Sequence, residues 1–322
     1  MTYSLYFLLP IFILLQDGKP QGAGAPANKQ FSAKDKSIVY FSSDNGNSWQ
    51  DKSDGLPAPI VVTDIAVSGD MLAILSKQQD IYLYDFVKVK WQRLAGKPAI
   101  STDLDALFIR NNNFITGTHG DGIFVSANNG AKWTSMNAGL GNLTIRKLVE
   151  IDNKLYAGTN GGLYVYLDKE NKWVLEFGTG SLQVNGITAL DGEIFIGTNQ
   201  GVFKSIKGLN NWIKVLPNQS LHNISADAQT VYAMVYSELF VSNDKGRSWQ
   251  SDQRGMPTGM YSFHVTRKDN ALFVAQWDGV YRKSGGSSWI LASKGMPAKF
   301  PVTELKVFKN LIIAGSSGWV NK

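Results

Sequence analysis

Seven of the nine tryptophans recur at a nearly constant interval along the 322-residue chain. The successive intervals are 42, 42, 40, 39, 37 and 40 residues, for Trp49, Trp91, Trp133, Trp173, Trp212, Trp249 and Trp289. A period near 40, with short apolar runs between the repeats, is typical of architectures with one four-stranded unit per repeat. The spacing therefore predicts a repeat protein rather than two unrelated domains.

Short runs of branched and aromatic residues recur in phase with the tryptophans. A first-strand position occurs seven times, at residues 62–67, 104–109, 145–150, 184–190, 223–226, 262–266 and 302–308. A second run follows each of these, and Gly or Asn bounds many of the runs, as is expected of antiparallel strands. We therefore predict an all-β fold, a seven-bladed β-propeller of four-stranded antiparallel blades.

The two ends of the repeat region complement each other. The N-terminal end supplies only a third strand (38–42) and a fourth (around Trp49), whereas the C-terminal end supplies only a first and a second. Pairing these strands in one blade closes the ring and leaves no exposed sheet edge. The propeller is thus predicted over residues 37–322. Trp319 and Val320 resemble the start of a further third strand, so either two segments compete for one position or the tail lies outside the blade.

The first 27 residues have the composition of a secretory signal. An apolar run at 5–15, interrupted by Pro10, is shorter than the roughly 20 residues that span a bilayer. Two small-x-small sequences follow at 23–25 and 25–27, although residues 1–4 carry no Lys or Arg. We predict a signal peptide at 1–27, a polar linker at 28–36 and a secreted or extracytoplasmic location, in the periplasm or outside the cell. The mature chain is expected to have no transmembrane segment; the alternative, a buried segment, does not fit the repeat register.

Composition narrows the chemistry. The chain has no cysteine, which excludes disulfides, thiol catalysis and thiolate metal ligands. Its histidines, His119, His222 and His264, are far apart, so we predict neither a metal site nor a cofactor. The net charge of +6 comes from scattered residues rather than a basic run, so we expect no nucleic-acid partner. We expect a monomer.

A recurring turn precedes several of the predicted fourth strands. Residues 42–49 and 242–249 match the pattern S-x-D-x-G-x-x-W in full, residues 126–133 carry Asn in place of Asp, and residues 284–289 keep only Gly and Trp. Asp or Asn accepts hydrogen bonds from its own turn, Gly takes a positive φ, and Trp packs on the sheet. We assign structural roles to Asp44, Gly46, Trp49, Asn128, Gly130, Trp133, Asp244, Gly246 and Trp249.

This pattern resembles the Asp-box, or BNR, repeat of sialidases, sortilin-type receptors, xyloglucanase-type glycosidases and photosystem II assembly-factor-like propellers. The Gly-Leu/Met-Pro sequences at 55–57, 255–257 and 295–297 resemble the same families. The resemblance covers residues 37 to about 320. In these families the box is structural and lies on the outer rim, so the resemblance implies the fold and does not specify an activity.

Ligands of propellers usually approach one end of the central channel, through loops between blades and between second and third strands. We therefore name a candidate ligand-binding set: His119, Asp121, Asn160, Asn199, Glu238, Arg254, Trp277 and Asp278. Trp277 lies outside the tryptophan ladder and is the most distinctive of them. The alternative for each is an ordinary solvated loop residue.

Enzymatic chemistry has little support in these residues, and we assign no catalytic residue. A sialidase needs an arginine triad and a Tyr–Glu nucleophile pair, and the chain has no Arg-Ile-Pro sequence. Glycoside hydrolysis needs two carboxylates roughly 5–10 Å apart. The spacing of Asp121, Glu238 and Asp278 marks no two as partners. We predict a non-catalytic propeller that binds a protein or glycan partner through the channel-mouth loops. The alternatives are a sialidase-like or xyloglucanase-like glycoside hydrolase without the usual motif, and a structural module with no small ligand.

Overall fold

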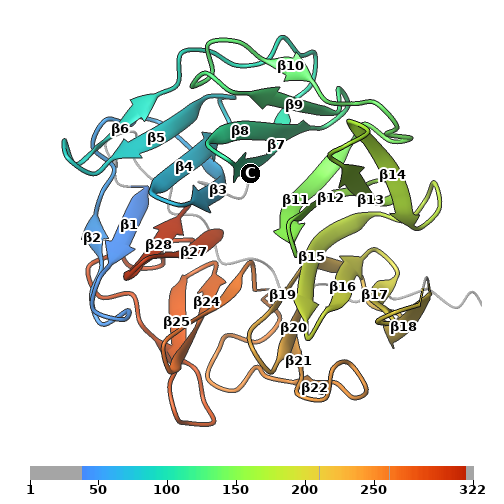
Figure 1. Ribbon diagram of the computed structural model, residues 1–322. Coiled ribbons are helices and arrows are strands. Elements are labelled where there is room, and N and C mark those ends of the chain that lie inside the picture. The colour runs from blue at the N-terminus through green and yellow to red at the C-terminus, as the bar shows by residue number, and fades with distance from the viewer. Residues whose placement is uncertain (1–37, 210, 261, 317–322) are drawn as a thin grey trace, which may run out of the picture.

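A computed structural model describes residues 38–209, 211–260 and 262–316. The predicted signal peptide, the linker and the pair Trp319–Val320 lie outside these residues. The described chain consists of 28 strands in seven four-stranded antiparallel sheets arranged as a ring (Figure 1). No helix in this part of the chain is long and apolar enough to cross a membrane. The prediction of a seven-bladed, all-β propeller is confirmed.

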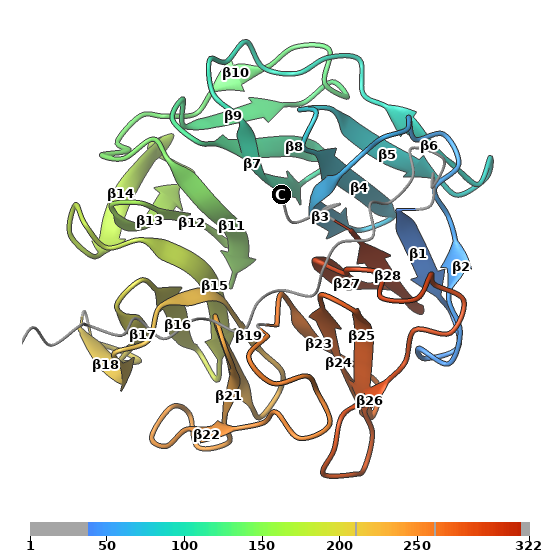
Figure 2. The same ribbon diagram turned by 180° about the vertical axis from the view of Figure 1, so that it is seen from behind.

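Six blades are continuous in sequence, each running from an inner strand at the channel to an outer strand at the rim (Figure 2). Their strands are β3 (Val62–Ser68), β4 (Met71–Ser76), β5 (Ile81–Asp85) and β6 (Lys90–Arg93); β7 (Leu104–Arg110), β8 (Asn113–Thr118), β9 (Ile123–Ser126) and β10 (Thr134–Ser135); β11 (Ile145–Ile151), β12 (Lys154–Thr159), β13 (Gly162–Leu167) and β14 (Lys172–Phe177); β15 (Val184–Leu190), β16 (Glu193–Thr198), β17 (Gly201–Ser205) and β18 (Trp212–Pro217); β19 (Leu221–Ala226), β20 (Val231–Val235), β21 (Leu239–Ser242) and β22 (Gln250–Ser251); and β23 (Val265–Lys268), β24 (Ala271–Gln276), β25 (Gly279–Lys283) and β26 (Ile290–Leu291).

The seventh blade joins the two ends of the chain. Its order is β27 (Glu304–Phe308), β28 (Leu311–Gly315), β1 (Val39–Ser42) and β2 (Gln50–Asp51). β1 pairs antiparallel with β28 over four residue pairs, from Val39 opposite Gly315 to Ser42 opposite Ile312. Figure 1 shows β1 lying beside β28. Closure of the ring by N- and C-terminal strands, as predicted, removes the open edges that a linear array would expose.

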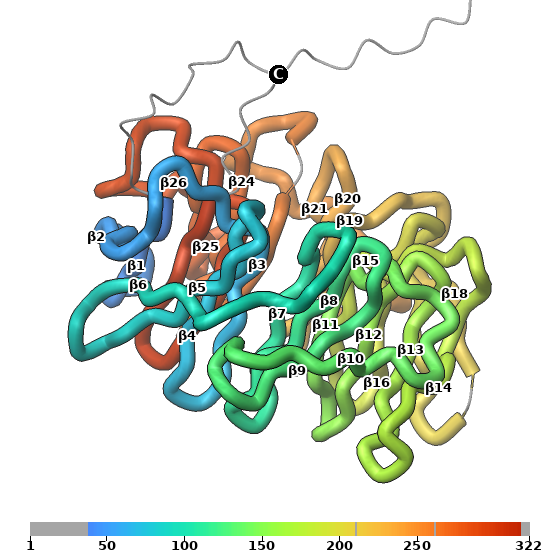
Figure 3. Tube along the Cα trace, turned by 90° about the horizontal axis from the view of Figure 1, so that it is seen from above, coloured from blue at the N-terminus to red at the C-terminus, as the bar shows by residue number. Residues whose placement is uncertain are grey.

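Apolar side chains fill the spaces between neighbouring blades. One cluster combines Leu75 and Ile81 of one blade with Leu104 and Phe114 of the next, and all four are buried. The cluster at the closing blade joins Val39 and Ile313 to residues of β3–β6 in the same way. Because each sheet buries both faces, the core follows the whole ring, which is seen edge-on in Figure 3.

The tryptophans of the ladder join consecutive blades. In five of them the indole Nε1 donates to a backbone carbonyl of the preceding blade, at 2.7–3.2 Å: Trp49 to Ala292, Trp91 to Lys52, Trp133 to Gly96, Trp173 to Met136 and Trp289 to Asp252. The same contact recurs in five of the seven blades, which is consistent with a period of one tryptophan per repeat. Trp249 is half-buried, as Trp133 is, but it differs because its Nε1 has no hydrogen-bond partner among the described residues. Trp212 is also half-buried and stacks on Phe177.

The turns before β2, β10 and β22 hold themselves together through hydrogen bonds. In the first, Asp44 Oδ1 accepts from Ser42 Oγ and from the Ser48 amide, both at 2.9 Å, and the Gly46 amide donates to Ser42 Oγ. The turn at Asp244 repeats these bonds, and Asn128 replaces the carboxylate in the third. The Ser48 hydroxyl and amide bonds lower the pKa of Asp44 to about 2, and Ser248 does the same for Asp244. The predicted structural role of these turn residues therefore has a local cause.

Candidate functional site: the channel mouth

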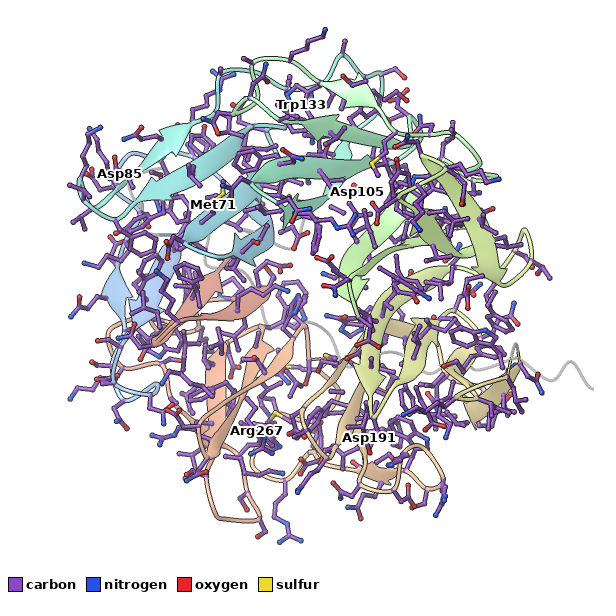
Figure 4. All side chains as sticks on the ribbon, in the orientation of Figure 1. Met71, Asp85, Asp105, Trp133, Asp191 and Arg267 are labelled. Carbon is purple, nitrogen blue, oxygen red and sulfur yellow. The ribbon has the colours of Figure 1, made fainter. Side chains whose placement is uncertain are left out.

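The inner strands begin at one end of the channel, and five of them begin with a β-bulge. At each bulge the register with the second strand skips one residue: Thr63, Asp105, Arg146, Asn185 and His222. A bulge adds a residue that has no cross-strand partner and redirects side chains. Every extra residue is polar or ionisable. Asp105, on β7, lies at the inner edge of the ring (Figure 4). The bulges therefore gather varied polar groups at one end of the channel, here called the mouth.

One half of the mouth is charged. His119 Nδ1 lies 2.8 Å from Asp105 Oδ2, which links the loop after β8 to the start of β7. In the next blade Arg146 Nε donates to Asn160 Oδ1, and this bond links the loop after β12 to the start of β11 in the same way. The two predicted residues His119 and Asn160 are thus paired with bulge residues, and this half presents an acid, an imidazole and a guanidinium.

The other half of the mouth is aromatic. His222 lies with its ring 5.7 Å from Tyr236 and 6.3 Å from Phe263, and Phe263 meets Trp277 edge-to-face at 4.7 Å. Tyr236 is 57% exposed, so this cluster reaches solvent. Burial lowers the pKa of His222 to about 4, which keeps its imidazole neutral at neutral pH. Trp277, the most distinctive predicted residue, therefore belongs to a shared aromatic surface.

Two predicted residues stabilise the loops of the mouth. The Asp121 carboxylate accepts four hydrogen bonds, from the amides and hydroxyls of Ser101 and Thr102. These bonds, led by the Thr102 hydroxyl, lower the pKa of Asp121. Asn199, two blades on, follows β16 directly, as His119 follows β8, and its Oδ1 accepts from the Gln183 amide at 3.0 Å. In both cases the side chain ties the second-to-third-strand loop to the incoming interblade loop.

Of the three remaining predicted residues, two lie in loops at the mouth and one lies near the rim. Glu238 is half-buried in the hairpin between β20 and β21. Asp278 Oδ2 accepts from Tyr281 Oη at 2.9 Å, and its Oδ1 is buried without a partner in the described part of the chain. Arg254 is exposed and donates to Ser287, in the turn before the outer strand β26. Arg254 therefore lies near the rim, whereas the other seven lie in loops at the mouth.

Below the mouth, ionisable side chains from three inner strands meet in the channel. Asp64 of β3 accepts from the amides of Ile65 and Leu107, both at 2.9 Å, and lies 3.9 Å from Lys147 Nζ of β11. Asp64 raises the pKa of Lys147, while burial and repulsion from Lys147 lower the pKa of Lys306 on β27. We did not single these residues out from the sequence. The sequence feature that could have indicated them is a charged residue within a predicted inner strand.

A metal ion has no evident ligands in the part of the chain that the structure describes, because no group of three or more His, Asp or Glu side chains converges there. The mouth instead offers hydrogen-bond donors, acceptors, charges of both signs and ring faces. Side chains of these kinds suit recognition of a ligand by direct contact.

Comparison with protein-family models and with curated proteins found no match. Among solved structures, the chain is similar to YCF48 bound to D1 peptide (TM-score 0.64, 13% identity, 81% of this chain and 95% of that one). It is also similar to the GH74 xyloglucanase from Xanthomonas campestris (0.64, 14%, 81% and 52%). A third similar structure is PorZ, a surface component of the type-IX secretion system of Porphyromonas gingivalis (0.56, 12%, 77% and 34%). At these identities the similarity shows the propeller fold alone.

Proposed function

We propose that the protein is a non-catalytic, secreted or periplasmic β-propeller that binds a protein or glycan partner through the channel mouth. The observation that carries this proposal is the set of bulges, which presents Asp105, Arg146 and His222 together at one end of the channel. Charges of both signs beside an exposed aromatic cluster favour an extended protein segment, because both backbone and side chains of such a segment find partners there. Aromatic rings with nearby amides also suit a glycan, which is the second candidate.

The neighbours in structure support both candidates without deciding between them. YCF48 has a bound D1 peptide in its structure, and the GH74 protein is a xyloglucanase. An extracytoplasmic location is supported by the apolar N-terminal run and by the similarity to PorZ, a bacterial surface component. We further infer that the hydrogen-bonded turns at Asp44, Asn128 and Asp244 are Asp-box repeats.

Glycoside hydrolysis is the less favoured function. A general acid needs a carboxyl group that holds its proton near neutral pH. Asp121 favours its ionised form instead, because four hydrogen bonds to the carboxylate lower its pKa. Turnover of a panel of chromogenic glycosides by the purified protein would favour the hydrolase instead.

The proposal is tested by screening the protein against a peptide-display library and a glycan array, then comparing two variants on every hit. Tyr236→Ala alters the mouth at an exposed position, and Val87→Ala alters a 93% exposed position in the β5–β6 hairpin. We expect Tyr236→Ala to weaken binding about tenfold or more and Val87→Ala to leave it unchanged. Hits that both variants bind equally well, or an absence of hits in both screens, would contradict binding at the mouth.

A further inference from the structure

A basic groove opens between the blades β15–β18 and β19–β22. Asp191 follows the C-terminal end of β15, so the groove lies at the face of the ring opposite the mouth; Figure 4 labels Asp191 where these blades meet. Its main hollow, of about 580 Å³, is lined by Asp191, Glu193, Lys204, Lys207, Lys245 and Arg247. A second hollow of about 570 Å³ shares Asp191, Lys245 and Arg247 and continues past Gln229, Asn243 and Asp244. The Asp244 carboxylate is bonded to Ser242 and Ser248 of its own turn. The groove therefore has an excess of cations at one end, and at the other it has two amides beside the turn-bound carboxylate of Asp244.

In the part of the chain that the structure describes, two of the four cations in the main hollow have no carboxylate within 4.0 Å. Lys204 Nζ lies 3.2 Å from Glu193 Oε2, and Lys245 Nζ lies 2.6 Å from Asp191 Oδ2, so both acidic groups are occupied. Among the described residues, Lys207 Nζ is hydrogen-bonded to the Asp191 carbonyl oxygen alone, at 3.4 Å. For the exposed Arg247 guanidinium the described residues provide no acidic partner within 4.0 Å. The hollow therefore has a net positive charge that a bound anion would neutralise.

The backbone conformation at Lys245 is a second, independent observation. Lys245 occupies a turn position with φ +60°, and the equivalent positions of the other two turns are Asn45 at +61° and Asn129 at +53°. Asn tolerates positive φ far better than Lys does. The exposed pair with Asp191 stabilises little in compensation. Of the three turns, this one alone has cations at both positions that flank the glycine, 245 and 247, where the turn at 42–49 has Asn45 and Asn47.

We propose that this groove binds a sulfated glycan, with sulfate esters against Lys207, Lys245 and Arg247 and sugar hydroxyls against Gln229 and Asn243. Sulfate presents only acceptor oxygens, which match the ammonium and guanidinium donors. The amide end suits neutral hydroxyl groups, and two adjoining hollows accommodate more than a single small anion. The site shares no residue with the mouth, so it does not depend on the proposed function.

The test measures binding of a heparin-derived tetrasaccharide to the full chain by calorimetry, at low and at high salt. Lys245→Asn/Arg247→Asn is the informative variant, because it recreates a turn sequence that this chain already uses at Asn45 and Asn47. We expect the variant to bind the tetrasaccharide about tenfold or more weakly than the unmodified chain, at a Tm equal to or above that of the unmodified chain. We also expect binding by the unmodified chain to weaken with salt.

Three comparisons complete the design. Lys132→Ser/Lys309→Asn removes two exposed positive charges on other blades. Lys132 has the turn position that Ser48 occupies elsewhere, and Lys309 is itself at a φ of +54°. This control should bind normally, and the desulfated tetrasaccharide should not bind. Equal binding by the groove variant and the unmodified chain would overturn the proposal. Equal loss in the control, or tighter binding of a poly-glutamate peptide than of the sulfated sugar, would also overturn it.

Discussion

Gly295 lies against the backbone of Trp49 so closely that a Cβ atom added to it would stand 2.2 Å from the Trp49 carbonyl oxygen. The Trp49 amide also donates to the Lys294 carbonyl, at 2.8 Å. The same approach recurs at Gly55 with Trp91, Gly139 with Trp173 and Gly255 with Trp289. In the Gly295–Trp49 pair it joins the last continuous blade to the blade that closes the ring.

A side chain at Gly295 should therefore destabilise the contact between the last continuous blade and the closing blade. We expect Gly295→Ala to lower the free energy of unfolding by about 3 kcal/mol, combining roughly 1–2 kcal/mol for a positive φ of +98° with the overpacking cost. Gly259→Ala is the matched control, because Gly259 has φ +73° and nothing within 4 Å of an added Cβ. Gly259→Ala should lower the free energy of unfolding only by the roughly 1–2 kcal/mol that comes from the positive φ. Chemical denaturation measures both, and equal losses would mean that the close approach has no energetic weight.

The stability lost on substituting a ladder tryptophan should depend on whether its indole Nε1 has a hydrogen-bond partner. Trp289 is 2% exposed and donates to the Asp252 carbonyl at 2.9 Å. Trp289→Phe leaves that carbonyl without its donor and should cost about 1–3 kcal/mol. Trp249→Phe removes a buried donor that has no partner among the described residues, so its loss should be smaller. We also expect Trp289→Ala to cost about 3–5 kcal/mol and Trp249→Ala less. Reversed ranks in thermal denaturation would contradict the role given to the indole hydrogen bond.

Acid should weaken the two turns built on aspartate. The folded-state pKa values of Asp44 and Asp244 are about 2, below the ordinary 3.8, so the turns favour the ionised carboxylates. The stabilisation is present above about pH 4 and is lost as pH falls towards 2. We expect Asp44→Asn/Asp244→Asn, which copies the residue that the third turn has at Asn128, to flatten this part of the stability–pH curve. NMR titration of both carboxyl groups provides the direct measurement, and values near 3.8 would refute the assignment.

The ring and its turns were predictable because their determinants are local or periodic. A tryptophan every 40 residues, strands bounded by Gly and Asn, and a turn of eight residues are all visible without tertiary information. Membership in the ladder did not predict burial, however, because Trp249 and Trp289 share a position and differ in their neighbours. Gly139 was not singled out, since Leu140 is followed by Gly141 rather than proline.

The mouth was predictable only in outline. Loops between second and third strands do converge there, yet the partners of their side chains depend on contacts across the chain. Asp121 accepts a hydrogen bond from Thr102, 19 residues earlier, and so connects two loops of the mouth. The bulge residues, including Arg146 and His222, interrupt strand patterns by one position, and period-two alternation carries no signal for such an insertion. The ligand-binding roles proposed for the mouth remain predictions.

The Asp64 carboxylate holds inner strands together in the channel. On β3, Asp64 accepts hydrogen bonds from two buried amides, one of them on β7. It also faces Lys147 of β11, whose side chain is 21% exposed, so it joins three inner strands. Asp64→Ala should cost about 3–5 kcal/mol, because two amides lose their acceptor and a largely buried cation loses its counter-charge. Asp64→Asn, which retains one acceptor oxygen, should cost less.

Two further variants distinguish this role from a general effect of removing an acid. Asp70→Ala removes a 92% exposed carboxylate that pairs with Lys309, and it should leave the free energy of unfolding nearly unchanged. Adding Lys147→Met to Asp64→Ala should recover part of the loss, since the unpaired charge is then gone. If urea denaturation gives the double variant the same stability as Asp64→Ala alone, the cost lies in the orphaned amides of Ile65 and Leu107. Asp64 would then act as a backbone clamp between inner strands, with its charge contributing little.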